Sequence, residues 1–228
     1  MKGGLKLMDR ILIAPSTDPA KSKEDLLKYV QEIQDYADFL HCDVMDGKFV
    51  ERKTISYDTI SLLKQHCLLP LDVHLMVQDP MVVIDEFARS GANIITIHYE
   101  SFLDKKEVVK ALKKIKQQGC LVGISIKPKT SVIEIVDVLD YVDLVLVMSV
   151  EPGKSGQSFI EESLSKICEL ANIRTKKSLN FLIEVDGGVN LNNSSSIIKS
   201  GADVLVSGNC VYSATDRKDV IKKLRNEQ

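Results

Sequence analysis

The segment Phe-Leu-His-Cys-Asp-Val-Met at residues 39–45 decides the fold. Its apolar residues predict a buried β-strand, yet the segment also carries His41 and Asp43, which strand alternation places on one face. Comparable segments recur at 72–74 (Asp-Val-His) and 184–186 (Glu-Val-Asp), and another predicted strand ends at 14–16 (Ala-Pro-Ser). Only a fold that gathers the ends of distant strands at one point makes a single site of them. A closed parallel barrel does this.

Short β-rich apolar runs recur along the whole chain, and each is too apolar for a sheet with one face in water. We expect eight strands, at residues 11–16, 39–44, 71–76, 94–99, 121–126, 144–150, 181–187 and 204–209. Amphipathic stretches between them predict helices, most clearly at residues 23–36, 81–90, 105–118, 132–139, 160–171 and 218–226. Gly91 and Gly119 follow two of these stretches, as C-terminal caps would.

Eight alternating strand and helix units in 228 residues are typical of an α/β protein with a single TIM (β/α)8 barrel, here one domain over residues 1–228. The main rival is a doubly wound open sheet, which has the same alternation. That fold normally has a glycine-rich turn after an early strand, whereas the first strand here ends in Ala-Pro-Ser-Thr at 14–17. The barrel is therefore the predicted fold.

The composition limits the partners and the compartment. Lys and Arg number 30 against 32 Asp and Glu, and the net charge of -2 gives no general attraction for nucleic acid. No apolar run approaches the roughly 18 residues of a membrane span, and residues 1–8 are too short and polar for a signal sequence. The five cysteines are widely spaced and lack a Cys-x-x-Cys pattern, which indicates reduced, mostly buried thiols in a cytoplasmic protein.

Four polar residues on three predicted strands form a candidate metal site. His41 and Asp43 share one face of their strand, and His74 and Asp186 lie at equivalent heights on two others. Two imidazoles and two carboxylates suit Zn²⁺, Fe²⁺, Mn²⁺ or Co²⁺ without choosing among them. Because burying so many polar groups without a purpose is costly, we predict one divalent metal ion here.

Other polar residues near strand ends have simpler interpretations. A lone histidine on a strand is usually a structural hydrogen-bonding residue, which is the interpretation we give to His66 and His98. An aspartate at a strand end often caps the next helix, and we expect this role for Asp72.

Four runs of the chain together resemble the signatures of the ribulose-phosphate 3-epimerase family, in order and at about the family's spacing. They are 41–47 (His-Cys-Asp-Val-Met-Asp-Gly), 71–76 (Leu-Asp-Val-His-Leu-Met), 148–153 (Met-Ser-Val-Glu-Pro-Gly) and 184–189 (Glu-Val-Asp-Gly-Gly-Val). The resemblance extends from about residue 13 to residue 212. Four ordered motifs are far more specific than any one of them.

The resemblance implies an enzyme of the pentose phosphate pathway that interconverts D-ribulose 5-phosphate and D-xylulose 5-phosphate, with one divalent metal ion per subunit, and a homo-oligomer, either a dimer or a hexamer. Carried over by position, His41, Asp43, His74 and Asp186 match the metal ligands, and Asp43 and Asp186 also match the two acid/base residues. Substrate contacts are implied for Ser16, His74, Asp186 and three methionines that line the family's site, Met45, Met76 and Met148.

Epimerisation beside a ketone explains why these residue types are needed. A proton must leave carbon from one face and return to the other, and Asp43 and Asp186 on opposite sides of the substrate can exchange the roles of base and acid. The metal ion would polarise the ketone and hold the developing oxyanion. The three methionines would form an apolar wall that excludes water.

Three loops with glycine are candidates for binding the phosphate through backbone N–H groups. The sixth strand is followed by Gly153, Lys154, Ser155 and Gly156, the seventh by Gly187 and Gly188, and the eighth ends at Gly208 and Asn209. The family's usual sequences here are Gly-Phe-Gly-Gly and Gly-Ser, so the chain departs from it at 154–155 and 209. It also departs at 17–22 and 48–52, in loops that shape the mouth of the family's site.

Three alternatives stay open at this point. A close variant of the reaction is 3-epimerisation of a ketohexose 6-phosphate such as allulose 6-phosphate. A non-catalytic barrel that only binds a phosphosugar is disfavoured, because binding alone does not need two opposed carboxylates. A metal-free isomerase or lyase would use Lys127 or Glu100, but neither residue explains the two histidines.

Overall fold

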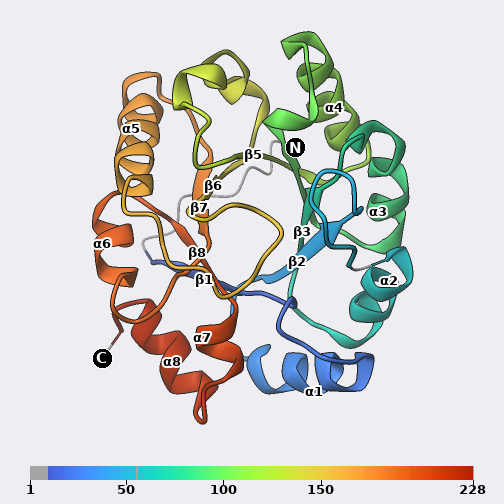
Figure 1. Ribbon diagram of the computed structural model, residues 1–228, viewed down its shortest axis with the longest axis vertical. Coiled ribbons are helices and arrows are strands. Elements are labelled where there is room, and N and C mark those ends of the chain that lie inside the picture. Colours follow the sequence, from blue (N-terminus) through green and yellow to red (C-terminus); the bar gives the residue numbers. More distant parts are fainter. Residues whose placement is uncertain (1–9, 55, 228) are drawn as a thin grey trace.

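Eight parallel strands form a nearly closed barrel that a ring of helices surrounds (Figure 1). The computed structural model describes residues 10–54 and 56–227. The strands are β1 Leu12–Pro15, β2 Leu40–Met45, β3 Leu71–Met76, β4 Ile94–His98, β5 Leu121–Ile126, β6 Leu144–Met148, β7 Leu182–Asp186 and β8 Val204–Ser207. From β2 to β8 each strand pairs with its neighbour in sequence, and β1 pairs with β8. The predicted TIM barrel is confirmed, since a doubly wound sheet would leave its edge strands apart.

The seam between β1 and β2 closes through few contacts. Ser16 forms an isolated parallel bridge with His41, and the Thr17 N–H donates to the His41 carbonyl at 2.9 Å. Pro15 has no N–H to give to a ladder at this place. The thinnest seam of the barrel therefore lies beside His41.

The helices expected at 23–36, 81–90, 105–118 and 218–226 form close to those bounds, whereas the helices over 57–66, 194–199 and 209–212 were not assigned from the sequence. Ser22 caps α1 by accepting from the Asp25 N–H, and Asp104 caps α4 through the Lys106 N–H. Gly91, with φ of 112°, ends α3 in the left-handed conformation. The helices are α1 Lys23–Ile33, α2 Tyr57–His66, α3 Ile84–Ser90, α4 Lys105–Gln117, α5 Ser163–Lys176, α6 Ser194–Lys199, α7 Asn209–Tyr212 and α8 Arg217–Leu224.

Two predicted helices differ in the structure. Residues 132–139 do not form an α-helix but two 3₁₀ segments, η3 Val132–Glu134 and η4 Val136–Tyr141. Four of the first five residues are β-branched, which lowers helix propensity. The helix expected at 160–171 begins only at Ser163, because the Ile160 N–H donates to the Ser149 carbonyl and holds this residue at the end of β6. Two further 3₁₀ turns are η1 Pro80–Val82 and η2 Tyr99–Ser101.

The apolar side chains form two cores, one on each face of the sheet. The larger core lies between the outer face of the barrel and the helices. The smaller core fills the barrel interior with Leu12, Ala14, Phe39, Ile94, Leu144, Leu146, Met148, Val150, Leu182, Val204 and Val206. Both faces are covered, which explains why the strands are so apolar.

One device recurs at the amino-terminal end of the strands, the floor of the barrel. A side chain that lies just before each even-numbered strand accepts one hydrogen bond. The donor is a backbone N–H at the start of the preceding odd-numbered strand. The pairs are Asp38 with Ile13, Asn93 with Leu71, Asp143 with Val122, and Asp203 with Ile183, at 2.7 to 2.9 Å. The repeated Gly-Ala-Asn and Gly-Ala-Asp triplets of residues 91–93 and 201–203 supply two of these acceptors.

The expectation of unpaired thiols is confirmed, because all five cysteines are free. Cys42, Cys67 and Cys120 are buried, whereas Cys168 is exposed and Cys210 half-buried. Within residues 10–54 and 56–227, no helix has the length and apolar character needed to cross a membrane.

Candidate active site

The polar residues of β2, β3 and β7 meet in the upper half of the barrel interior. In the register of β2 with β3, His41 lies opposite Asp72 and Asp43 opposite His74. Alternation turns all four side chains inward, and β7 adds Glu184 and Asp186 on the same face. The barrel therefore brings together residues 145 positions apart in the chain, from 41 to 186.

The four residues predicted as metal ligands form one cluster. His41, Asp43, His74 and Asp186 each offer a donor atom, and these atoms all lie within 4.8 Å of one another. Asp43 Oδ1 is 3.3 Å from His41 Nε2 and 3.1 Å from His74 Nδ1. The structure thus gathers the four residues as the sequence predicted.

The donor atoms of this cluster fit a divalent cation. His41 Nε2 is fully buried and has no hydrogen-bond partner among the described residues, whereas Nδ1 of the same ring lies 2.5 Å from Asp72 Oδ2. Burial lowers the pKa of His41, but the charges of Asp43 and Asp72 outweigh burial and raise it well above its usual range. The site favours a positive charge at this point, and mixed nitrogen and oxygen donors suit a transition metal.

Asp72 does not cap a helix, so that expectation is wrong. It is completely buried in β3, with its carboxylate beside the His41 ring. Glu184 approaches the same ring nitrogen, with Oε1 3.9 Å from His41 Nδ1, so that His41, Asp72 and Glu184 form a second buried cluster. Burial and the neighbouring Asp72 raise the pKa of Glu184 well above its usual range. Both acids lie beneath the predicted ligands.

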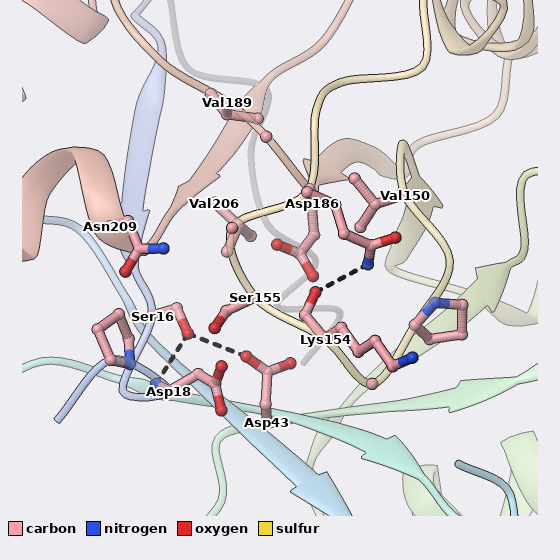
Figure 2. Close-up of a pocket in the computed structure, with 18 of the residues that line it drawn as sticks. Ser16, Asp18, Asp43, Val150, Lys154, Ser155, Asp186, Val189, Val206 and Asn209 are labelled. Atoms are coloured by element: carbon pink, nitrogen blue, oxygen red, sulfur yellow. Dashed lines mark hydrogen bonds between the residues drawn. The ribbon is translucent and has the colours of Figure 1, made fainter. Parts of the chain in front are cut away.

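Ser16, at the end of β1, lies beside the Asp43 oxygen that does not face the two histidines (Figure 2). Its hydroxyl donates to Asp43 Oδ2 at 2.9 Å and accepts from the Asp18 N–H at 3.1 Å. The two oxygens of Asp43 thus face different partners, one the histidines and one the serine. This arrangement fixes the orientation of the carboxylate.

The pKa values of the two candidate acid/base residues are shifted in opposite directions. Burial raises the pKa of Asp186 to about 7, with the charge of Asp43 adding to the effect. Burial also acts on Asp43, but the charge of His41 together with the hydrogen bond and charge of His74 outweighs it and holds the pKa of Asp43 well below its usual range. Two carboxyl groups with separated pKa values are the arrangement expected of an acid and a base in one site.

His98 and His66 have different surroundings. His66 is exposed at the end of α2, not on a strand, and its side chain makes no hydrogen bond among the described residues, so the role expected for it is wrong. His98 is completely buried in β4, and its Nε2 lies 2.9 Å from Nε2 of His74. Burial lowers the pKa of His98 to about 4, so the ring is neutral at physiological pH. Its structural role is confirmed as hydrogen bonding, and its partner is a predicted ligand.

A pocket of about 550 Å³ opens above the cluster at the carboxyl ends of the strands. Figure 2 shows Asp43 and Asp186 reaching into it from opposite sides. The other predicted substrate residues that line it are Ser16, Met45, Met76, Met148, Gly153, Lys154, Ser155, Gly156, Gly187, Gly188, Gly208 and Asn209. His41 and His74 do not line the pocket, because both lie completely buried beneath it.

The glycines after β7 allow two loops to approach closely. Gly187 and Gly188 have φ of 119° and 66°, in the left-handed region. A Cβ on Gly188 would lie 2.5 Å from the backbone nitrogen of Phe159, and one on Gly187 would lie 2.5 Å from Val150. Glycine is therefore required at both positions for the loops after β6 and β7 to meet.

Comparison with known proteins identifies the family. The model of the ribulose-phosphate 3 epimerase family matches residues 12–212. The ribulose-phosphate 3-epimerase of Bacillus subtilis is 40% identical over 223 residues, 96% of this chain and 100% of that protein. The enzyme of that name from Escherichia coli K12 is 38% identical over 96% of this chain and 97% of its own length. The chain belongs to the ribulose-phosphate 3-epimerase family.

More distant proteins share the fold of this ribulose-phosphate 3-epimerase family member. The 3-keto-L-gulonate-6-phosphate decarboxylase of Vibrio cholerae superposes with a TM-score of 0.71 at 13% identity, over 95% of this chain and 96% of its own. A 3-hexulose-6-phosphate synthase from Salmonella typhimurium gives 0.71 at 16% identity, over 95% and 97%. At such identities the likeness concerns the barrel alone.

The loops after β1 and β2 contact each other at the mouth of the pocket. Arg52 of the loop after β2 donates to both oxygens of Asp18 in the loop after β1, at 3.1 and 2.8 Å. Asp18 lines the pocket. Neither residue was among the predicted site residues. No motif in the sequence indicates that the two would contact each other.

The acids beneath the ligands were also missed, although a signal for them exists. Asp72 stands two residues before His74, and Glu184 two before Asp186, so each shares the inward face of its strand with a predicted ligand. The alternation that joined His41 to Asp43 applies equally to both.

Proposed function

We propose that this chain catalyses the interconversion of D-ribulose 5-phosphate and D-xylulose 5-phosphate by proton transfer at C3. The relatives named ribulose-phosphate 3-epimerase support the reaction. The observation that carries the mechanism is the placement of Asp43 and Asp186, whose carboxylates enter one pocket from opposite sides above two buried imidazoles.

We assign proton transfer to the two carboxylates. One ionised carboxylate removes the proton from C3, and the other carboxyl group returns a proton to the opposite face of the planar enediolate. In the reverse direction the two exchange roles, so no redox cofactor is needed. The pKa of about 7 lets Asp186 act as donor or acceptor near neutral pH.

We assign the ligand set to His41, Asp43, His74 and Asp186, and leave the ion as Zn²⁺, Fe²⁺, Mn²⁺ or Co²⁺. An ion bound there would supply Lewis-acid stabilisation of the negative charge that develops on the ketone oxygen. The Nε2 of His41, which has no hydrogen-bond partner within residues 10–54 and 56–227, supports this assignment.

The remaining pocket residues are assigned to binding and to exclusion of water. Met45, Met76 and Met148 are at most 4% exposed and form an apolar wall. The backbone of Gly187, Gly188, Gly208 and Asn209, with the loop from Gly153 to Gly156, is assigned to the phosphate. Lys127 and Glu100, the nominees of the metal-free alternative, do not line this pocket.

A second candidate is 3-epimerisation of a ketohexose 6-phosphate such as allulose 6-phosphate. The contact between Arg52 and Asp18 supports it, because both residues lie in loops that depart from the family pattern and Asp18 lines the pocket.

The test follows D-ribulose 5-phosphate in D₂O by ¹H NMR, with the purified protein before and after chelation and after restoration of metal. We expect metal-dependent deuterium entry at C3 together with xylulose 5-phosphate. Exchange with allulose 6-phosphate alone would favour the second candidate. Absence of exchange with both would contradict catalysis and leave a barrel that only binds phosphosugars.

We also propose a homo-oligomer, a dimer or a hexamer, and a cytoplasmic location. The family resemblance supports the assembly, and the five free thiols support the compartment. Light scattering on the eluted protein would give the subunit number, and a monomer at working concentration would contradict the assembly.

A further inference from the structure

A chain of hydrogen bonds leads from the candidate metal site into the barrel wall. His74 Nδ1 faces Asp43 at 3.1 Å, and its Nε2 lies 2.9 Å from Nε2 of His98. His98 Nδ1 in turn lies 3.0 Å from Oε2 of Glu100. Neither His98 nor Glu100 belongs to the proposed ligand set or lines the pocket.

Glu100 is itself held at the end of this chain. Its Oε1 accepts from the Lys127 N–H at 2.7 Å and from the Thr130 hydroxyl, both in the loop after β5. Lys166 of α5 donates to the carbonyls of Lys127, Pro128 and Thr130 and so secures this loop from outside. The carboxylate therefore has a fixed position.

Packing fixes the His98 ring as well. The ring is completely buried, with its centroid 4.9 Å from that of His74 and 4.7 Å from that of Phe49. The Lys127 ammonium lies over the other partner, 3.9 Å from the Phe49 centroid. His98 has no room to turn without displacing these neighbours.

If His74 binds a metal ion through Nδ1, only one arrangement of protons on the two imidazole rings satisfies the hydrogen bonds between His74, His98 and Glu100. A neutral imidazole carries one N–H, so His74 must carry it on Nε2. Two ring nitrogens 2.9 Å apart bond only if one is bare, which leaves Nε2 of His98 as the acceptor. The N–H of His98 is then on Nδ1 and donates to Glu100.

We propose that His98 and Glu100 are positioning residues that hold His74 in the tautomer and ring orientation required for metal binding. This inference rests on the proposed metal site. Hydrogen-bond partners of metal-bound histidines typically contribute 10 to 100-fold in metal affinity. His41 has a separate hydrogen-bond partner in Asp72. His98 and Glu100 therefore act only on the imidazole of His74.

The test compares three substitutions with a matched control. His98→Phe removes the acceptor while keeping a ring in the cavity, His98→Gln restores an acceptor, and Glu100→Gln removes the terminal charge. The control is Ser125→Ala, because Ser125 is buried opposite His98 in the strand register and its hydroxyl has no partner among the described residues.

The readouts are metal affinity by chelator competition and the protonated ring nitrogens by ¹⁵N NMR of the full chain, with and without Zn²⁺. We expect wild-type protein to carry protons on Nε2 of His74 and Nδ1 of His98. Affinity should fall about 10 to 100-fold in His98→Phe and about tenfold in Glu100→Gln, and His98→Gln should recover most of the loss. Ser125→Ala should match wild type.

Three results would overturn the inference. The first is a wild-type His74 protonated on Nδ1 in the metal-loaded protein, and the second is wild-type affinity in Glu100→Gln. The third is loss of affinity in His98→Gln equal to that in His98→Phe, which would indicate packing alone. If His98→Phe does not fold, Glu100→Gln and the tautomers still decide. A wild-type protein that epimerises with metal while Glu100→Gln is unaffected would refute this inference and leave the proposed function standing.

Discussion

Asp186 is the single residue on which the proposed chemistry depends most directly, since it lies in both the ligand set and the acid/base pair. Asp186→Asn keeps the shape of the side chain but cannot accept the proton from C3. We expect a folded barrel with weaker metal affinity and turnover reduced about a thousandfold or more. Circular dichroism, metal content and the NMR assay at saturating metal would measure this. Near-normal turnover would contradict the two-carboxylate mechanism.

Glu100 should make the free energy of unfolding depend on pH in the acidic range. Burial raises its pKa, but the hydrogen bond from His98 and those from Lys127 and Thr130 outweigh burial and lower the pKa to about 2, from 4.5. A carboxylate with a lowered native pKa stabilises the fold above its unfolded pKa, and this contribution is lost as pH falls through the native value.

Glu100→Gln should therefore reduce the free energy of unfolding by about 2 kcal/mol at pH 7, and the difference from wild type should shrink between pH 4.5 and pH 2. Urea unfolding of both proteins at pH 7, 4 and 3 would measure it. A difference that stays constant over this range would rule out the carboxylate charge as the cause.

At the scale of the elements, the loops after β6 and β7 decide the shape of the pocket. Gly188→Ala places a Cβ 2.5 Å from the Phe159 nitrogen, at a φ of 66° that side chains disfavour. We expect the loop from 153 to 160 to move and the KM for the phosphorylated substrate to rise about tenfold, equivalent to about 1.4 kcal/mol of binding.

Gly119→Ala is the matched control for this substitution. Gly119 has a similar φ of 80°, but a Cβ there would meet nothing within 4 Å. It should lose about 1 kcal/mol of stability from the backbone conformation and leave KM unchanged. Equal KM values for the two variants would show that contact between the loops does not shape the substrate site.

At the scale of the whole molecule, the two ends of the barrel have separate tasks. The floor ties neighbouring strands together through Asp38, Asn93, Asp143 and Asp203, whereas the polar cluster lies at the other end. Changes to the floor should therefore alter stability without altering chemistry.

Asp203 tests this separation, because it accepts from the Ile183 N–H and pairs with Arg174. Asp203→Ala should cost about 2 kcal/mol of unfolding free energy, from a lost ion pair and an unpaired backbone N–H. Asp203→Asn should cost less, since Asn93 serves as acceptor at the corresponding place. Denaturant titration and kcat would be compared, and a large fall in kcat in the folded Asn variant would contradict the separation.

Particular residues show how far prediction from sequence reaches. Leu71–Met76 and Leu121–Ile126 were predicted with correct bounds, because apolar runs bounded by turn residues depend on local signals. The segment 132–139 was not, since β-branched residues and helical spacing conflict there. His98 was correctly given a hydrogen-bonding role, but its partner His74, 24 residues earlier, is a matter of barrel register.

The sequence by itself determined the alternation of strands and helices, the closed barrel and the four residues proposed as metal ligands, because each follows from local periodicity and from motifs. The tertiary structure alone decided that Asp72 and Glu184 lie beside His41, that His98 contacts both His74 and Glu100, and that Arg52 reaches Asp18. Those contacts depend on which strands and loops become neighbours when the barrel closes, and the local sequence does not specify this.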